Sequence, residues 1–259
     1  MRTTASRDAE TLAPPSRWRT VLRSHSAMPV VLAVVLLAMY LWVNSLQLDE
    51  IERRVLNPDT LLRMLGQHLK LTAVTTVIVV IVAVGAGILL TRPALRWLAP
   101  AATGLANIGQ ATPAIGLLVL LTIWLGIGFT TALIGLVAYA LLPVLQNTIV
   151  GLNQVDRKLI EAGHGIGMSP LAVLTRVELP LAVPVILAGV RTALVLTVGV
   201  ATLATFINAG GLGGLIVTGI KLQRTPVLVT GAVLTAALAL LLDWLGGVIT
   251  ELFRPRGLD

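Results

Sequence analysis

Residues 71–90 read LTAVTTVIVVIVAVGAGILL, and none of these twenty residues is charged. An α-helix rises about 1.5 Å per residue, so a helix of this length covers about 30 Å, the thickness of the hydrocarbon core of a bilayer. A single segment surrounded by lipid must satisfy its backbone hydrogen bonds internally, which an α-helix does. The stretch therefore predicts a transmembrane α-helix.

Five further apolar runs surround it, at residues 28–46, 98–126, 131–152, 182–206 and 227–249. The run 98–126 is interrupted by the polar segment 107–113, so we expect an interfacial helix followed by a span kinked at Pro113. No small-x-small cleavage site follows the first run, which is therefore expected to remain as a span. The chain is predicted to be an all-α polytopic membrane protein with about six transmembrane helices.

The composition excludes several other classes of protein. Hydrophobic residues make up 56% of the chain and charged residues 12%, whereas soluble domains carry about 25% charged residues. There is no cysteine, and the three histidines lack metal-ligand spacing. There is no Gly-x4-Gly-Lys-Ser/Thr motif for ATP. Although the net charge is +7, the basic residues are scattered beside apolar runs, so we expect no nucleic-acid partner, no metal and no catalytic residue.

The basic residues indicate the topology. With six spans and the amino terminus inside, twelve of the 19 Lys and Arg residues lie on the cytoplasmic side and six outside. This bias follows the positive-inside rule. The predicted parts are a cytoplasmic tail at 1–27, a first transmembrane helix with an external loop at 28–60, a transmembrane domain at 61–250, and a cytoplasmic tail at 251–259.

The longest cytoplasmic loop, residues 153–180, has an unusual pattern of small residues. We expect a short helix over 156–166, capped by Asp156 or Asn153. Gly167 permits a tight reversal, and Ser169-Pro170 opens a second short helix that Leu179-Pro180 ends. The loop would be a compact knob with a small-residue face formed by Ala162 and Gly163.

This loop resembles the EAA loop of bacterial ABC-importer permeases, whose pattern is Glu-Ala-Ala, three residues, Gly, nine residues and Ile-x-Leu-Pro. Every spacing matches, with Gly163 at the second alanine of the pattern and Val177 at the isoleucine. The resemblance implies a type I ABC-importer permease fold in the bacterial inner membrane, and a loop that couples the permease to a separate ATPase. The positions that carry it are Glu161, Ala162, Gly163, Gly167, Val177, Leu179 and Pro180.

Four other segments, 109–113, 142–146, 179–192 and 209–213, are similar to the osmoprotectant branch of these permeases. That resemblance covers residues 61–249 and implies import of glycine betaine, choline, carnitine or proline betaine. It also implies a cytoplasmic ATPase dimer that holds the ATP and magnesium, a second permease subunit, which is a copy or a homologue, and an extracytoplasmic solute-binding protein. No cofactor is expected on this chain.

Three alternatives remain. The same machinery could carry another small solute, such as an amino acid. A secondary carrier would need several intramembrane carboxylates for ion coupling, and only Asp243 is available. An intramembrane enzyme would need a metal site or a Ser/Lys or Ser/His dyad within the spans, and the sequence offers none.

Arg191 and Asp243 are the only formal charges inside the predicted spans. They lie at similar depths, so we expect them to form an ion pair between two helices; a contact with the substrate is the alternative. Asp243 also continues a row of small residues at i, i+4 spacing, which is typical of a helix–helix contact. The row consists of Gly231, Thr235, Ala239, Asp243 and Gly247.

The remaining candidates are polar or glycine residues in or near the spans. The glycine-rich segment 208–214 is expected outside, either as a flexible connection or as an outer gate or docking surface. Helix–helix hydrogen bonding is the ordinary role of polar residues in spans, and lining of the pathway is the alternative. No cluster of aromatic residues could form a quaternary-ammonium cage, so substrate selection is expected in the binding protein. The pathway or gate candidates are Gln110, Thr112, Pro113, Asn147, Asn208, Gly210, Gly211 and Gly213.

Overall fold

The computed structural model describes residues 27–252, which are almost entirely helical and contain no strand. Five helices are long and apolar enough to cross a membrane, and a sharply bent helix pair supplies a sixth crossing if it is counted as one span. This agrees with the predicted class and number of spans. The long helices are α2 (Ala27–Ser45), α4 (Pro58–Thr91), α7 (Phe129–Asn153), α10 (Leu179–Ala201) and α12 (Thr225–Leu252).

Short elements connect these helices. They are α3 (Glu50–Val55), a 3-10 turn (Arg96–Leu98), α5 (Ala99–Ala111), α6 (Ala114–Leu125), α8 (Arg157–Gly165), α9 (Pro170–Val173), a π-helical turn (Leu174–Glu178), a 3-10 turn (Leu203–Ile207) and α11 (Gly213–Lys221). The predicted tails at 1–27 and 251–259 lie almost wholly outside the described residues.

Helix α4 begins 13 residues before the apolar run that predicted it. The side chain of Asn57 caps its start by accepting a hydrogen bond from the amide of Thr60 at 2.8 Å, and Pro58 occupies the first turn. Hydropathy marks the part of a helix that lipid can surround, whereas capping residues mark where the helix starts.

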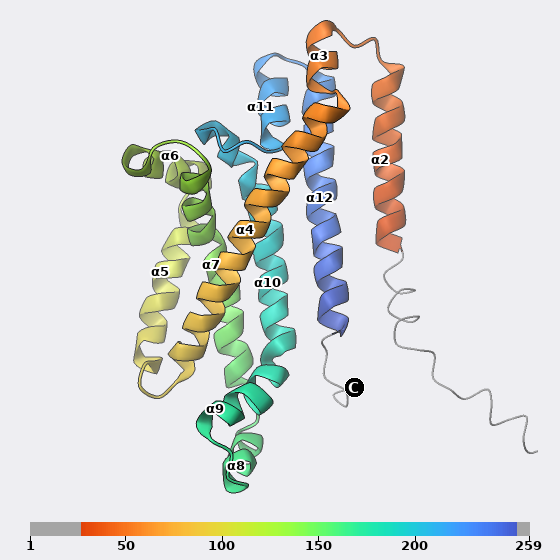
Figure 1. Ribbon diagram of the computed structural model, residues 1–259. Helices are drawn as coiled ribbons and strands as arrows, with labels where there is room; N and C mark the ends of the chain where they lie inside the picture. The colour runs from red at the N-terminus through yellow and green to blue at the C-terminus, as the bar shows by residue number, and fades with distance from the viewer. Residues whose placement is uncertain (1–26, 253–259) are drawn as a thin grey trace, which may run out of the picture.

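The region 98–126 is broken as expected, but its two pieces are arranged in the opposite order. α5 and α6 meet at an angle of 99° across Thr112 and Pro113. α5 runs along the bundle beside α7, and α6 lies crosswise, so the expectation of an interfacial helix followed by a span is wrong (Figure 1). The side chain of Leu118 in α6 is buried against Leu136 of α7, which fixes α6 in this position.

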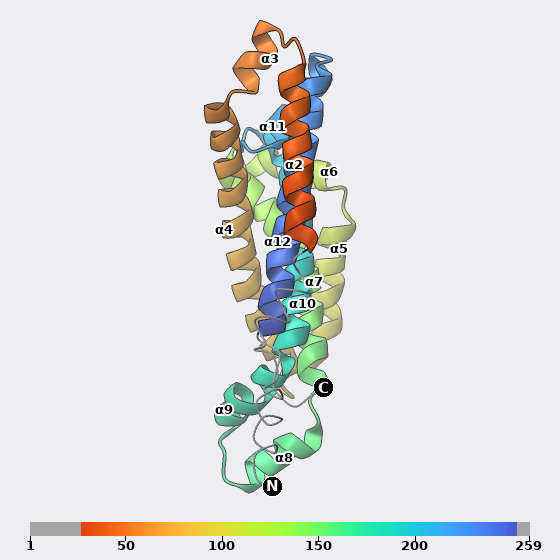
Figure 2. The same ribbon diagram turned by 90° about the vertical axis from the view of Figure 1, so that its right-hand side faces the viewer.

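The centre of the bundle is formed by α4, α7 and α10, which approach closely where glycines remove side chains. A Cβ atom on Gly87 of α4 would lie 2.5 Å from the Cγ2 atom of Thr148. One on Gly189 of α10 would lie 2.7 Å from the carbonyl oxygen of Pro143. Such small residues allow van der Waals packing between backbones in a membrane. α12 packs on α10 and α11, whereas α2 stands at the edge beside α12 (Figures 1 and 2).

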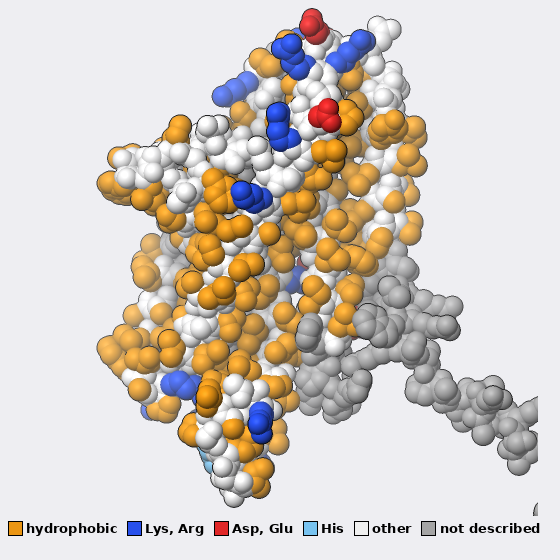
Figure 3. Space-filling model, in the orientation of Figure 1, with side chains coloured by type: hydrophobic (Ala, Val, Ile, Leu, Met, Phe, Trp, Pro, Cys, Tyr) orange, Lys and Arg blue, Asp and Glu red, His pale blue; other side chains and the backbone are white. Residues whose placement is uncertain are grey.

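The surface also fits a membrane protein. Figure 3 shows a broad apolar band around the middle of the molecule, with charged side chains gathered towards the two ends. α8 and α9 project beyond the bundle at one end, and α3 and α11 lie at the other (Figures 1 and 2). The predicted functional loop and the glycine-rich segment therefore lie towards opposite ends of the bundle.

Candidate functional site

The loop 153–178 folds into the predicted knob. Asp156 caps α8 by accepting a hydrogen bond from the amide of Lys158 at 2.9 Å, and Ser169 caps α9 ahead of Pro170. Between the two helices Gly167 adopts a φ of +84°, a conformation that glycine adopts without steric cost. The expected caps are confirmed, and the reversal at Gly167 brings α9 back against α8.

The predicted end of the second short helix is wrong. The chain does not stop at Leu179-Pro180, because α9 continues through the π-helical turn directly into α10. Pro180 has no amide hydrogen, and its ring would collide with the carbonyl four residues earlier in a regular α-helix. The wider π turn, in which the amide of Leu179 bonds to the carbonyl of Leu174, accommodates the proline without breaking the helix. The knob is thus joined rigidly to α10.

Ala162 and Gly163 do not form a shared face. Successive residues of an α-helix point about 100° apart, and here Gly163 is buried while Ala162 is exposed. A Cβ atom on Gly163 would lie 3.3 Å from Val173 of α9, so the glycine allows the two short helices to pack together. The outer surface of the knob, which also carries Glu161, exposes the apolar side chains of Leu159, Ile166 and Leu171.

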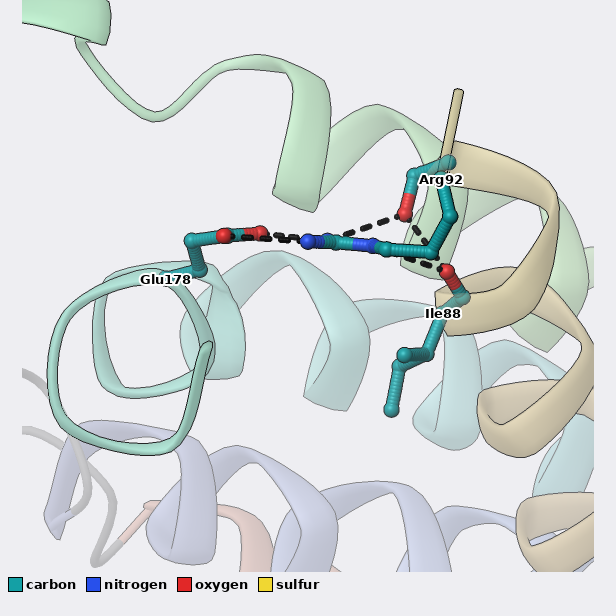
Figure 4. A network of polar contacts seen from close by, with 4 residues as sticks. Ile88, Arg92 and Glu178 are labelled. Carbon is teal, nitrogen blue, oxygen red and sulfur yellow. Dashed lines mark hydrogen bonds and ion pairs between the residues drawn. The ribbon is translucent and has the colours of Figure 1, made fainter. Parts of the chain in front are cut away.

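A partly buried ion pair that the sequence did not reveal ties the knob to the end of α4. The guanidinium of Arg92 donates from both terminal nitrogens to the carboxylate of Glu178, at 3.1 Å for the Nη1–Oε1 contact (Figure 4). Arg92 also donates to the carbonyl of Ile88 and to the hydroxyl of Thr91. Glu178 is buried, and it lies in the π turn at the variable position of the Val-x-Leu-Pro motif.

The pair stands at the edge of a hollow of about 690 Å³ between the α4–α5 turn and the knob. Its charged lining consists of Arg92, Arg96, Arg157, Glu161 and Glu178. The sequence signal for Glu178 is that it is an acidic residue between apolar neighbours. Arg92 entered the sequence analysis only as one of the basic residues that indicate the topology. The ion pair connects the knob to α4 across this hollow.

The glycine-rich segment is held in place by α4. Gly211 donates its amide hydrogen to Oε1 of Gln67 at 3.2 Å, and Leu212 donates to Nδ1 of His68 at 3.3 Å. Since Nδ1 accepts, the ring proton is on Nε2, which donates to the carbonyl of Val198 in α10 at 3.1 Å. Three residues of this segment have positive φ: Asn208 (58°), Gly210 (81°) and Gly211 (96°).

His68 is fully buried and thus joins α4, α10 and the segment that precedes α11. The arrangement favours a fixed outer surface over a flexible connection. Gln67 and His68 were missed because their partners are about 130 and 144 residues away in the sequence.

The side chains of Arg191 and Asp243 meet between α10 and α12. Arg191 donates from Nε to Oδ1 and from Nη2 to Oδ2, the second contact measuring 2.5 Å. Within the small-residue row, Gly231 faces Leu215 of α11, whereas Gly247 lies beneath the guanidinium of Arg191. The row therefore contacts two different helices.

The other pathway candidates are dispersed. Thr112 donates its hydroxyl hydrogen to the carbonyl of Ile108, and Asn147 donates its amide hydrogen to the carbonyl of Pro143, so both bonds stay within one helix. Pro113 stands at the bend after α5, and Gln110 is half-buried in the last turn of α5. Among residues 27–252 there is no group of three or more His, Asp or Glu side chains that could hold a metal ion.

Replacing Gly167 with valine is expected to destabilise the knob locally by about 1–3 kcal/mol, since a β-branched side chain is strained at positive φ. Asparagine tolerates this conformation, so Gly167→Asn should be milder. Protease cleavage of the loop in membrane vesicles would measure the change. Gly165→Ala is the matched control, because a Cβ atom there meets nothing within 4 Å and φ is not positive. Equal cleavage of the valine and asparagine variants would contradict the expectation.

Comparison with known proteins adds sequence and structural relatives. Residues 83–256 match the family described as "Binding-protein-dependent transport system inner membrane component". The chain is 39% identical over 203 residues to the glycine betaine/carnitine/choline transport system permease protein OpuCB of Bacillus subtilis, a match covering 78% of this chain and 93% of that protein. It is 39% identical over 216 residues to the osmoprotectant import permease protein OsmY of Salmonella typhimurium, covering 83% and 89% of the two chains.

Among solved structures, an inward-facing MetNI methionine ABC transporter chain superposes with a TM-score of 0.67 at 24% identity, covering 80% of this chain and all of that one. This similarity is one of fold. It agrees with the type I importer architecture that the loop resemblance implied.

Proposed function

This chain belongs to the family of binding-protein-dependent transport system inner membrane components, and we propose that its cargo is an osmoprotectant such as glycine betaine, choline, carnitine or proline betaine. It is a permease subunit of an ABC importer, and not an enzyme. The identity to two osmoprotectant permeases over more than three quarters of the chain carries the proposal for the cargo. The likeness to the methionine transporter concerns the fold and favours no amino acid as cargo.

We assign the knob as the attachment point of the ATPase, which would hold the ATP and magnesium. The knob projects beyond the bundle, and its outer surface carries Ala162 together with exposed Leu159, Ile166 and Leu171. Apolar side chains on a projecting loop beyond the apolar band are typical of a protein–protein contact. The continuous π turn and α10, together with the Arg92–Glu178 pair, would transmit movement of the knob into the bundle.

This assignment places the knob and both chain ends in the cytoplasm. The amino-terminal end of α2 and the carboxyl-terminal end of α12 are both directed towards the knob end of the molecule (Figure 1). The excess of Lys and Arg that supports this orientation comes partly from residues 1–26 and 253–259, outside the described residues. At the opposite end, α3, α11 and the segment fixed by His68 offer a surface for the solute-binding protein. A second permease subunit would complete the pathway.

Uptake of radiolabelled glycine betaine tests the cargo. A bacterial strain without other osmoprotectant importers, producing this chain with its ATPase and binding protein, should accumulate glycine betaine. Omission of the chain should abolish accumulation. Uptake of neither glycine betaine nor choline, carnitine or proline betaine would overturn the proposed cargo.

Replacing Ile166 with lysine is expected to lower both ATPase co-purification and uptake at least tenfold, because it places a charge in an apolar contact that excludes water. Ile166 is 82% exposed, so the substitution should leave the fold of the permease intact. Ile220→Lys is the matched control for ATPase co-purification, because Ile220 is also exposed but lies on α11 at the opposite end. Normal ATPase co-purification with Ile166→Lys would contradict the assignment of the knob.

A further inference from the structure

The only charged residues inside the apolar runs of the described helices are Arg191 and Asp243. Arg191 lies twelve residues after the start of α10 and Asp243 nine residues before the end of α12. At about 1.5 Å per residue these positions are about 18 Å and 14 Å from the helix ends. Charges at such depth are costly in a membrane and are found facing protein or a water-filled cavity.

The pair is open to its surroundings. The side chain of Arg191 is 43% exposed and that of Asp243 is 31% exposed. Two hollows of about 460 Å³ and 350 Å³ adjoin the pair, the first lined also by Thr192 and Thr250 and the second by Trp244. An ion pair that water can reach contributes little to stability, so stability alone does not account for two charges at this depth. This pair instead presents one positive and one negative group to the same open space.

Two glycines form the floor of this site. A Cβ atom on Gly246 would lie 3.3 Å from the Cγ atom of Arg191, and one on Gly247 would lie 3.4 Å from its Nη1 atom. The absence of side chains there lets the arginine lie flat on α12 with Nε and Nη2 directed at Asp243. The charges are thus fixed side by side on the surface of two helices.

We propose that Arg191 and Asp243 form a binding site for the zwitterionic solute in the permease, Arg191 binding its carboxylate and Asp243 its quaternary ammonium. This inference rests on the proposed osmoprotectant cargo. The planar guanidinium suits a carboxylate, and both charged side chains line the two hollows. The solute exchanges the internal ion pair for two contacts of the same kind, so its net binding is weak and it is released readily.

The experiment compares single and double neutral variants in cells that contain the complete transporter. Initial uptake of radiolabelled glycine betaine is measured for Arg191→Gln, Asp243→Asn and the double variant, at equal amounts of permease in the membrane. We expect at least a tenfold loss in all three, because the double variant lacks both charges that the solute requires.

A purely structural pair gives a different result, since Gln and Asn together leave no unpaired charge. Uptake by the double variant within twofold of the unmodified transporter would overturn the proposal, and so would failure of that variant to accumulate in the membrane. Arg63→Gln, which removes an exposed charge near the start of α4, should leave uptake unchanged.

Choline separates the two roles, because it has the quaternary ammonium but no carboxylate. Arg191→Gln should lower the ratio of glycine betaine to choline uptake at least fivefold, a change in selectivity that loss of packing would not produce. An unchanged ratio with measurable uptake of both would overturn the role of Arg191. Absence of uptake of any of these solutes by the unmodified transporter would instead overturn the proposed cargo, and this inference with it.

Discussion

Replacing Arg92 with alanine is expected to lower the free energy of unfolding by about 3–5 kcal/mol, because it leaves the buried carboxylate of Glu178 without a partner. Uptake should fall with it, since the pair holds the knob to the end of α4. Glu178→Ala should cost less. The side chain of Arg92 is 34% exposed against 8% for Glu178, so the arginine left behind can be hydrated and keeps its bond to the carbonyl of Ile88.

The order of the two effects is the useful measurement. In thermal unfolding of the detergent-purified permease, Arg92→Ala should have the lowest unfolding temperature, Glu178→Ala an intermediate one, and the unmodified protein the highest. A double variant, Arg92→Leu with Glu178→Leu, should recover much of the loss, because neither charge remains buried alone. Arg96→Ala is the control, since Arg96 is exposed and lies four residues further along the chain, beyond the turn that follows α4. If Glu178→Ala lowered the free energy of unfolding more than Arg92→Ala does, the loss could not be explained by an unpaired, buried Glu178 carboxylate.

Local signals in the sequence predicted the fold well. The apolar runs located the spans, Asp156 and Ser169 marked the starts of α8 and α9, and Gly167 marked the reversal. Each of these depends on residues within a few positions of one another. The contact between Arg191 and Asp243 could be predicted for a different reason. They are the only charges in the apolar runs and lie at similar depths, so each had a single possible partner.

Contacts between distant segments could not be predicted in this way. Arg92 and Glu178 are 86 residues apart, and several other basic residues lie near the same end of the bundle. His68 binds backbone groups of Val198 and Leu212, which have no side-chain signal in the sequence. Hydropathy favours α6 over α5 as the spanning piece, because α6 is the more apolar of the two. The observed order depends instead on the burial of Leu118 against α7, which hydropathy does not indicate.

Gly213→Ala is expected to prevent stable folding, and this should be the largest effect of a single methyl group in the glycine-rich segment. A Cβ atom on Gly213 would lie 1.9 Å from the carbonyl oxygen of Thr202 and 2.6 Å from its carbonyl carbon. These are backbone atoms beside the end of α10, so no side-chain rotation relieves the collision. The start of α11 would have to move, which would break the bond between Leu212 and His68. We expect a cost of more than about 3 kcal/mol.

The neighbouring Gly214 provides a matched control. A Cβ atom there would lie 3.4 Å from the terminal methyl of Met64 and 3.5 Å from the hydroxyl of Thr205, both at the ends of side chains. Gly214→Ala should therefore change the free energy of unfolding by less than about 1 kcal/mol. Membrane yield and thermal unfolding of the two variants would measure the difference. If Gly213→Ala accumulated and unfolded as Gly214→Ala does, the segment before α11 would have to be a yielding connection, and its role as a fixed docking surface for the binding protein would fall with that result.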